Sequence, residues 1–161
     1  MAKTNVKTKF QIQEFLNDLL SPASKHEIGK RVVTQCKQMI ASGQSPVRGH
    51  GRFDGYSDSY QEQIKDGDLD NKTVRPVNLK QTGRMLYQFT YDLREQGIAV
   101  GFVDADPEVV AIARKHQKGE GRMPARRMIP EGQEEWAVSV MQIIKKVYSE
   151  RLNAIIKRSN K

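Results

Sequence analysis

The first third of the chain carries apolar residues at helical spacing, in two consecutive groups. The first group predicts a helix that ends at Ser21-Pro22, because the residue before a proline disfavours helical geometry. A capping-box pattern from Ser24 to Glu27 predicts the start of a second helix, which ends at Ala41–Gly43. The apolar positions of the two helices are, in order, Phe10, Ile12, Phe15, Leu16, Leu19 and Leu20, then Ile28, Val32, Cys36, Met39 and Ile40.

Alternating apolar and polar residues predict a β-hairpin in the middle of the chain. From Tyr87 to Leu93 every second residue is apolar, which is the pattern of a half-buried strand. Gly97 suits the turn, since glycine readily takes positive φ. The alternation resumes from Ile98 to Phe102, so the two runs should pair as antiparallel strands.

The last third predicts two helices and one more short strand. Asp106 is a suitable N-cap and Pro107 a suitable first residue for a helix that stops near Gly119. Residues 126–129 predict a third strand. The acidic segment 131–135 predicts the start of a long last helix, because negative charge is favourable at that end of the helix dipole.

Together these elements describe an α+β fold, with a small antiparallel β-sheet and its hairpin packed against N-terminal, central and long C-terminal helices. Trp136 is expected to fix the start of the last helix to the sheet. We assign residues 10–161 to a single domain. Residues 1–9 lack an apolar pattern and are expected to form a mobile arm.

Residues 44–78 are expected to form a long loop, interrupted by a short helix near residues 57–65. Glycines and prolines occur here without any clear period. A loop of this length in a compact domain is usually functional or disordered. The alternative is a surface loop with no role.

Composition sets limits on the class of protein. The chain has 161 residues, enough to bury a sizeable core, and 37% of them are hydrophobic. No apolar run approaches the ~20 residues that span a bilayer, and we expect neither a membrane segment nor a secretory signal. The single cysteine, Cys36, lies on an apolar helix face and is expected to be a small buried residue rather than a nucleophile.

Few residue patterns suggest catalysis or ligand binding. An Asp-x-Asp-x-Asp run at residues 66–70 copies the first ligands of a calcium loop, but Asn71 stands where that loop needs glycine. The three histidines lie far apart and lack metal-ligand spacing. No nucleophile elbow or triad signature accompanies His116, so a hydrolase using it is the weakest interpretation. We expect no enzymatic activity, no cofactor and no metal site.

Four segments, in order along the chain, resemble motifs of the tail-completion and head–tail joining proteins of long-tailed bacteriophages. The resemblance covers residues 28–156. Arg127 and Met128 depart from it, since proline and phenylalanine are usual at these positions. The segments are Tyr56-Ser57-Asp58-Ser59-Tyr60; Leu79-Lys80-Gln81-Thr82-Gly83-Arg84-Met85; His116-Gln117 with Gly119; and Pro124-Ala125-Arg126.

This resemblance implies a virion protein that is assembled in the host cytoplasm and forms a homo-oligomeric ring at the head–tail junction, sixfold or twelvefold. Such a ring caps the tail tube as a tail terminator or neck subunit and docks the head-closure ring. DNA passes through its lumen without specific recognition. The predicted hairpin and the 44–78 loop are the segments we assign to assembly. In the resembling family the region that corresponds to this loop makes subunit contacts, so the resemblance implies that the loop orders only in the oligomer. The expected assembly residues are Tyr56, Ser57, Tyr60, Thr82, Gly83, His116, Gln117, Arg122, Arg126 and Arg127.

A net charge of +8 and a pI near 9.6 favour one alternative, a basic DNA-binding or DNA-packaging accessory protein. Basic residues concentrate between Arg114 and Arg127, where they could form a positive surface. Aromatic residues do not interleave with them, so base stacking is unsupported. We expect this surface to meet an acidic face of a neighbouring subunit instead. Charge reversal at Arg126 and Arg127 is therefore expected to block ring assembly and leave the monomer folded.

Overall fold

The structure is a computed structural model that describes residues 15–19, 21–69, 71–79, 82–95, 97–121 and 123–159. It has the predicted α+β fold, with helices around a two-stranded antiparallel hairpin. The predicted arm at residues 1–9 and the predicted assembly residue Arg122 lie outside the described residues. Residues 15–19 are helical. The other elements are α2 (Pro22–Ala41), α3 (Asp58–Lys65), α4 (Arg84–Tyr87), β1 (Thr90–Arg94), β2 (Gly97–Gly101), α5 (Pro107–Lys118) and α6 (Val138–Ser159).

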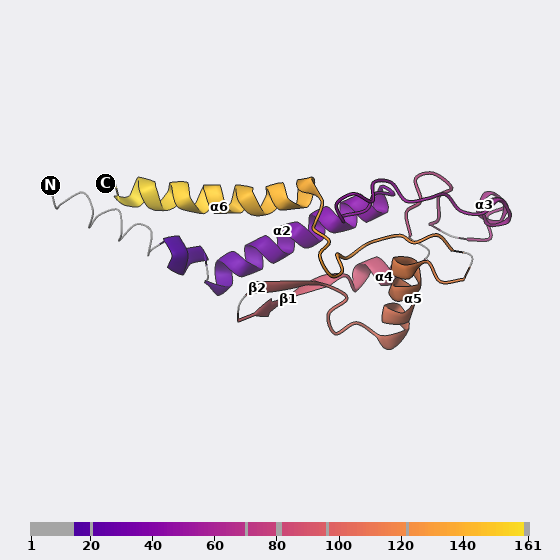
Figure 1. The fold of residues 1–161 in the computed structure, drawn as a ribbon, viewed down its shortest axis with the longest axis horizontal. Coiled ribbons are helices and arrows are strands. Elements are labelled where there is room, and N and C mark those ends of the chain that lie inside the picture. The colour runs from indigo at the N-terminus through magenta and orange to yellow at the C-terminus, as the bar shows by residue number, and fades with distance from the viewer. Residues whose placement is uncertain are drawn as a thin grey trace.

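Helix α2 lies at the centre of an elongated molecule (Figure 1). The long helix α6 runs beside it, and both strands of the hairpin also pack on α2. Helices α4 and α5 lie beyond the base of the hairpin, and α3 lies at the end farthest from the chain termini (Figure 1). The buried face of α2 is the one predicted from its apolar spacing, from Ile28 through Cys36 to Ile40. This single helix therefore supplies a shared wall for the other two layers.

The start of α2 differs from the predicted capping box. Ser21 is the N-cap, and its hydroxyl accepts a hydrogen bond from the backbone N–H of Ser24 at 3.3 Å. Pro22 occupies the first turn, where its missing N–H costs nothing. Ser24, the predicted cap, lies inside the helix and is fully buried. Pro22 therefore follows the first apolar group, as predicted, and also lies in the first turn of α2.

The hairpin is shorter than predicted, because the chain before it forms a helical turn. Gly83 takes a left-handed conformation with φ of 78° and starts α4, which contains Tyr87. Tyr87, predicted on the buried face of a strand, is 83% exposed. The strands then pair in the register Thr90 to Gly101 and Arg94 to Gly97. The predicted antiparallel hairpin is therefore confirmed, but Gly97 is the first residue of β2 and not part of the turn.

Close packing joins α2 to the hairpin at Gly29. A Cβ atom at this position would lie 2.4 Å from Cδ2 of Tyr91 on β1. No real side-chain carbon tolerates so short a contact, and the neighbour is a ring carbon held in a packed interface. Glycine at this position lets the strand approach the helix axis closely.

The prediction of a third strand at residues 126–129 is wrong. This segment pairs with no strand of the described chain, and its backbone bonds instead to side chains and to the end of α5. Helix α5 itself is as predicted, with Pro107 in its first turn and Gly119 as a left-handed C-cap at φ 70°. Asp106 occupies the N-cap position, but its carboxylate binds Arg84 and Gln88 rather than the helix backbone.

Helix α6 begins at Val138, after the acidic segment that was predicted to open it. Residues 131–137 instead pack beside the start of the predicted long loop. Trp136 forms an isolated antiparallel bridge with Val47, and the N–H of Ala137 donates to the carbonyl of Pro46 at 2.7 Å. The backbone of the tryptophan is therefore fixed to this loop. Trp136 also lines a cavity with Ile98 and Val100 of β2, in agreement with the predicted position of Trp136 between the last helix and the sheet.

An ion-pair network links the chain before α2, α2 and α6 at one end of the molecule. Arg31 pairs with Glu27 at 2.7 Å and with Glu150 of α6 at 3.0 Å. Arg151 of α6 pairs with Glu27 as well and with Asp18 at 3.6 Å. The hydrogen bond from Arg151 is the main cause that lowers the pKa of Glu27. These side chains are about one-third to one-half exposed, so each pair contributes modestly.

We predict that Gly29→Ala lowers the free energy of unfolding by about 1–2 kcal/mol, because overpacking against Tyr91 outweighs the gain in helix propensity. Chemical denaturation measures the change. In a Tyr91→Ala background, the same Gly29→Ala substitution should be neutral or stabilising, because the ring is gone. An equal loss in both backgrounds would show that the contact does not limit this position.

Candidate functional site

Three of the motif segments found in the sequence meet in one hollow of the structure. It is a cavity of about 400 Å³ between the start of α3, the end of α5 and the chain after α5. We call it the tyrosine pocket. Its lining residues are Tyr56, Ser57, Tyr60, Lys72, His116, Met123, Pro124 and Arg126.

Arg126 is buried in the wall of the tyrosine pocket, with 1% of its surface exposed. Its guanidinium carbon lies 5.0 Å from the ring centroid of Tyr56, a cation–π contact. One terminal nitrogen donates to the carbonyls of Asp54 and Gly55, at 3.3 and 3.4 Å. Its Nε has no hydrogen-bond partner among the described residues. Burial lowers the pKa of Arg126, which expresses the cost of keeping this charge away from water.

Lys72 brings a second cation to the same aromatic pair. The rings of Tyr56 and Tyr60 lie 5.1 Å apart, and the ammonium of Lys72 lies 5.0 and 5.3 Å from their centroids. Burial, and then the charge of Arg126, lower the pKa of Lys72. Lys72 has no signal in the sequence, because only the return of the chain after α3 brings it to the motif tyrosines.

His116, on the last turn of α5, is the third basic group in the pocket. Burial, followed by repulsion from Arg126 and Lys72, lowers its pKa from 6.5 to about 4. Its Nδ1 is buried and has no hydrogen-bond partner among the described residues. The imidazole is therefore neutral at pH 7, packed in an electropositive environment.

We predict that His116 makes stability depend on pH. Its pKa is about 4 when folded and about 6.5 when unfolded, so the unfolded state binds more protons between these values. The contribution of His116 to the free energy of unfolding is fully present above pH 6.5. As the pH falls from 6.5 to about 4, the free energy of unfolding decreases by up to ~3 kcal/mol. Denaturation of the wild type and His116→Gln across this range measures the difference. Parallel pH profiles would contradict the prediction.

Gln117 explains how the pocket is assembled. It is 6% exposed, and its Oε1 accepts from the backbone N–H of Met128 at 2.7 Å and of Ile129 at 3.2 Å. Its Nε2 donates to the carbonyl of Ile129. The side chain thereby holds residues 123–130, which we call the strap, against the end of α5. These bonds replace the strand ladder that was predicted for this segment.

Gly119 permits the same close approach. A Cβ atom there would lie 2.5 Å from the backbone nitrogen of Ala125, and its φ of 70° also favours glycine. The N–H of Arg126 donates to the carbonyl of His116 at 2.7 Å. The His-Gln-x-Gly segment and the Pro-Ala-Arg segment are thus two halves of one joint, which places Arg126 in the pocket.

We predict that Gln117→Leu lowers the free energy of unfolding by about 2–4 kcal/mol, because buried backbone groups of the strap lose their partners. Lys118→Leu, at the exposed neighbouring position, is the matched control and should change stability by less than about 0.5 kcal/mol. Thermal or chemical denaturation of both variants checks this. A Gln117→Leu variant as stable as the control would mean that the strap is held by packing alone.

The remaining predicted assembly residues lie outside the tyrosine pocket. Thr82 and Gly83 precede α4, where the Thr82 hydroxyl accepts from the N–H of Arg84 at 3.3 Å. Arg127 pairs with Glu131 at 2.8 Å and lies 3.8 Å from Glu134. The structure therefore brings together the Tyr-Ser-x-Ser-Tyr, His-Gln and Pro-Ala-Arg segments. Of the fourth segment, the backbone of Leu79 hydrogen-bonds Tyr56, whereas Thr82 and Gly83 do not line the pocket.

The predicted positive surface must also be corrected. Arg126 is buried, so reversing its charge would place a carboxylate in the protein interior and would not leave the monomer intact. Arg114 lies 3.6 Å from Glu120, and Arg127 is paired as well. In the described part of the predicted basic cluster, one cation is thus buried, two arginines pair with glutamates, and Lys115 and Lys118 are exposed.

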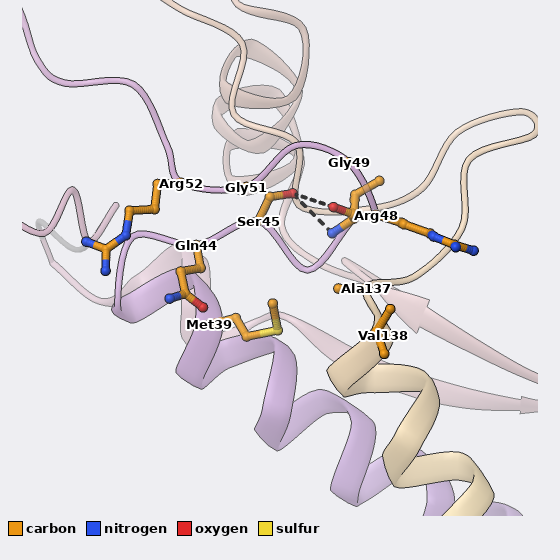
Figure 2. Close-up of a pocket in the computed structure, with 10 residues that line it drawn as sticks. Met39, Gln44, Ser45, Arg48, Gly49, Gly51, Arg52, Ala137 and Val138 are labelled. Carbon is orange, nitrogen blue, oxygen red and sulfur yellow. Dashed lines mark hydrogen bonds between the residues drawn. The ribbon is translucent and has the colours of Figure 1, made fainter.

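A second cavity, of about 310 Å³, lies between the end of α2, the loop 44–52 and the start of α6 (Figure 2). Its polar groups are used internally: the hydroxyl of Ser45 accepts from the N–H of Val47 at 3.1 Å and donates to the carbonyl of Arg127 at 2.7 Å. Figure 2 shows the side chains of Arg48 and Arg52 extending away from each other. These hydrogen bonds hold the loop in place, and the two arginines do not point into the cavity together to bind a charged ligand.

No cluster of three or more residues that could ligate a metal occurs in the described part of the chain. None of the described helices is long and apolar enough to cross a membrane. Comparisons with known protein families, curated proteins and solved structures gave no match. Function must therefore be inferred from the motifs and from the geometry that they build.

Proposed function

We propose that this chain is a structural subunit of a ring at the head–tail junction of a long-tailed bacteriophage, acting in tail completion or in the neck. Copies would surround the DNA channel in a sixfold or twelvefold ring, cap the tail tube and dock the head-closure ring. DNA would pass through without being read. This function requires a stable protomer and a surface that repeats from one copy to the next.

The main support is the convergence of three motif segments on the tyrosine pocket. One cavity is lined by Tyr56 and Tyr60 of the first segment, His116 of the second and Arg126 of the third. These residues are separated by up to seventy residues in the sequence. Such convergence is expected when separate motifs serve a common role. The Gln117–strap joint gives that role a structural basis, because it fixes the relative position of α5 and the chain that leads into α6.

The hairpin offers a surface for assembly. Within the described chain, β1 and β2 pair only with each other, so the outer edge of each strand has no neighbouring strand. An unpaired edge can accept a strand from another chain, and assembly then hides that edge. The strands of the hairpin and α3 lie apart along the long axis (Figure 1), so they form different surfaces, as a head-to-tail contact between unlike surfaces requires.

Tyr87 adds an apolar contact residue next to the hairpin. It is 83% exposed, the largest exposed fraction among the large hydrophobic side chains of the described chain. Tyrosine is enriched among residues that dominate binding energy at protein interfaces. An assembly contact would remove this ring from water.

The DNA-binding alternative has weaker support. It depends on a continuous basic surface. Among the described residues from Arg114 to Arg127, Arg126 is buried and Arg114 and Arg127 pair with glutamates, so fewer exposed positive charges remain than the sequence suggests. The net charge of +8 remains, and it is compatible with a ring that surrounds DNA.

We predict that a phage lacking this chain accumulates separate filled heads and free tails, and that supplying the wild-type chain restores joined particles. Electron microscopy of the lysate gives the result. Tyr87→Ser should restore joining poorly, because loss of an interface anchor of at least about 2 kcal/mol weakens subunit association more than tenfold.

Val110→Ser is the matched control, since Val110 is also an exposed apolar residue but lies on α5. It should complement like the wild type. Tails of abnormal length would assign the ring to the tail tube, and empty heads with normal tails would assign it to the portal side. Intact infectious particles in the absence of the chain would falsify the proposed function.

A further inference from the structure

The tyrosine pocket gathers positive charge without a paired acid. Lys72, His116 and Arg126 line one cavity, and none of the three forms an ion pair with a carboxylate of the described residues. Asp54 is close enough to raise the pKa of Arg126, but it is exposed and forms no ion pair with it. The other arginines near this end, such as Arg114 and Arg127, do have glutamate partners.

Burying these basic groups without a carboxylate partner is energetically unfavourable for the isolated chain. A buried cation is normally paired, because removal from water is otherwise uncompensated. The face of Tyr56 and two long hydrogen bonds to carbonyls offset only part of the cost for Arg126. Its Nε and the Nδ1 of His116 are buried polar atoms without partners among the described residues. Buried groups of this kind call for an explanation beyond packing.

We propose that the tyrosine pocket is a binding site for an oxyanion, a phosphate or carboxylate group. The Lys72 ammonium is half-buried at the cavity and would donate to the anion directly. His116 can place a proton on Nδ1, since no other described group fixes its tautomer through that atom. Arg126 supplies a fixed positive charge from the wall. The tyrosine rings exclude water, which strengthens these interactions.

The chemistry selects against other ligands. The charges of Lys72 and Arg126 repel cations, and an uncharged ligand would leave the Arg126 charge uncompensated. A volume of about 400 Å³ exceeds that of an isolated small anion. The pocket therefore suits either a free phosphate with bound water or a carboxylate that a neighbouring copy inserts as part of an acidic side chain.

The test is a titration of the full chain with inorganic phosphate at pH 7 and constant ionic strength, followed by NMR of the His116 ring. His116→Gln identifies that ring among the three histidines. The wild type should show a saturable shift of the His116 signals. Lys72→Met should weaken phosphate binding about tenfold or more, because a hydrogen bond to a charged group is lost.

Lys65→Met is the matched control, because it removes the same charge from an exposed position on α3 outside the pocket. It should bind phosphate like the wild type. Absence of a saturable shift in the wild type overturns the proposal, and so does equal weakening by both lysine variants. The titration uses the chain alone, so its result is independent of the proposed function.

Two further measurements identify the source of the oxyanion, once the site binds phosphate. If phosphate dissociates oligomers in sedimentation and acetate competes for the pocket, the natural occupant is a carboxylate of a neighbouring copy. If phosphate binds without changing the oligomeric state and acetate does not compete, the occupant is free phosphate. Either result supports an oxyanion site.

Discussion

Contact of α2 with two different layers is the constraint on which the rest of the structure depends. Its buried face is shared between the hairpin and α6, and the hairpin reaches it only because Gly29 has no side chain to meet the Tyr91 ring. A larger residue at position 29 would force the hairpin strands away from α2. It would also disturb the packing of α2 against α6, because the same helix contacts both the hairpin and α6. The hairpin, α6 and the segments between them are thus positioned relative to one element.

The end of the molecule that holds the tyrosine pocket depends on a second joint, made by the side chain of Gln117 with the strap. An amide that both donates and accepts can replace a strand pairing over two residues. This joint places Arg126 under Tyr56 although more than sixty residues separate them in sequence. The proposed assembly through the hairpin and the proposed anion binding in the tyrosine pocket would use different surfaces of the protomer.

Elements with a strong local signal were predictable from the sequence: the apolar face of α2, the antiparallel pairing of the hairpin and the helix that starts at Pro107 and is capped by Gly119. The failures have physical causes. Alternation made Tyr87 look like part of a strand, but Gly83 starts a helical turn there. The strap looked extended because its partner is a glutamine side chain, which periodicity does not show. Lys72 joins the pocket through tertiary packing alone, so no spacing could identify it.

The ion-pair network between α2 and α6 gives the two ends of the helix pair different responses to salt. Near Val140 and Val147 the contact is apolar and fully buried, whereas near Arg31 and Arg151 it relies on half-exposed charges. Dissolved ions screen exposed charges over about 10 Å or less at physiological concentrations and leave buried apolar contacts unaffected. Rising ionic strength therefore loosens the helix pair at its charged end first, while the valines keep the other end closed.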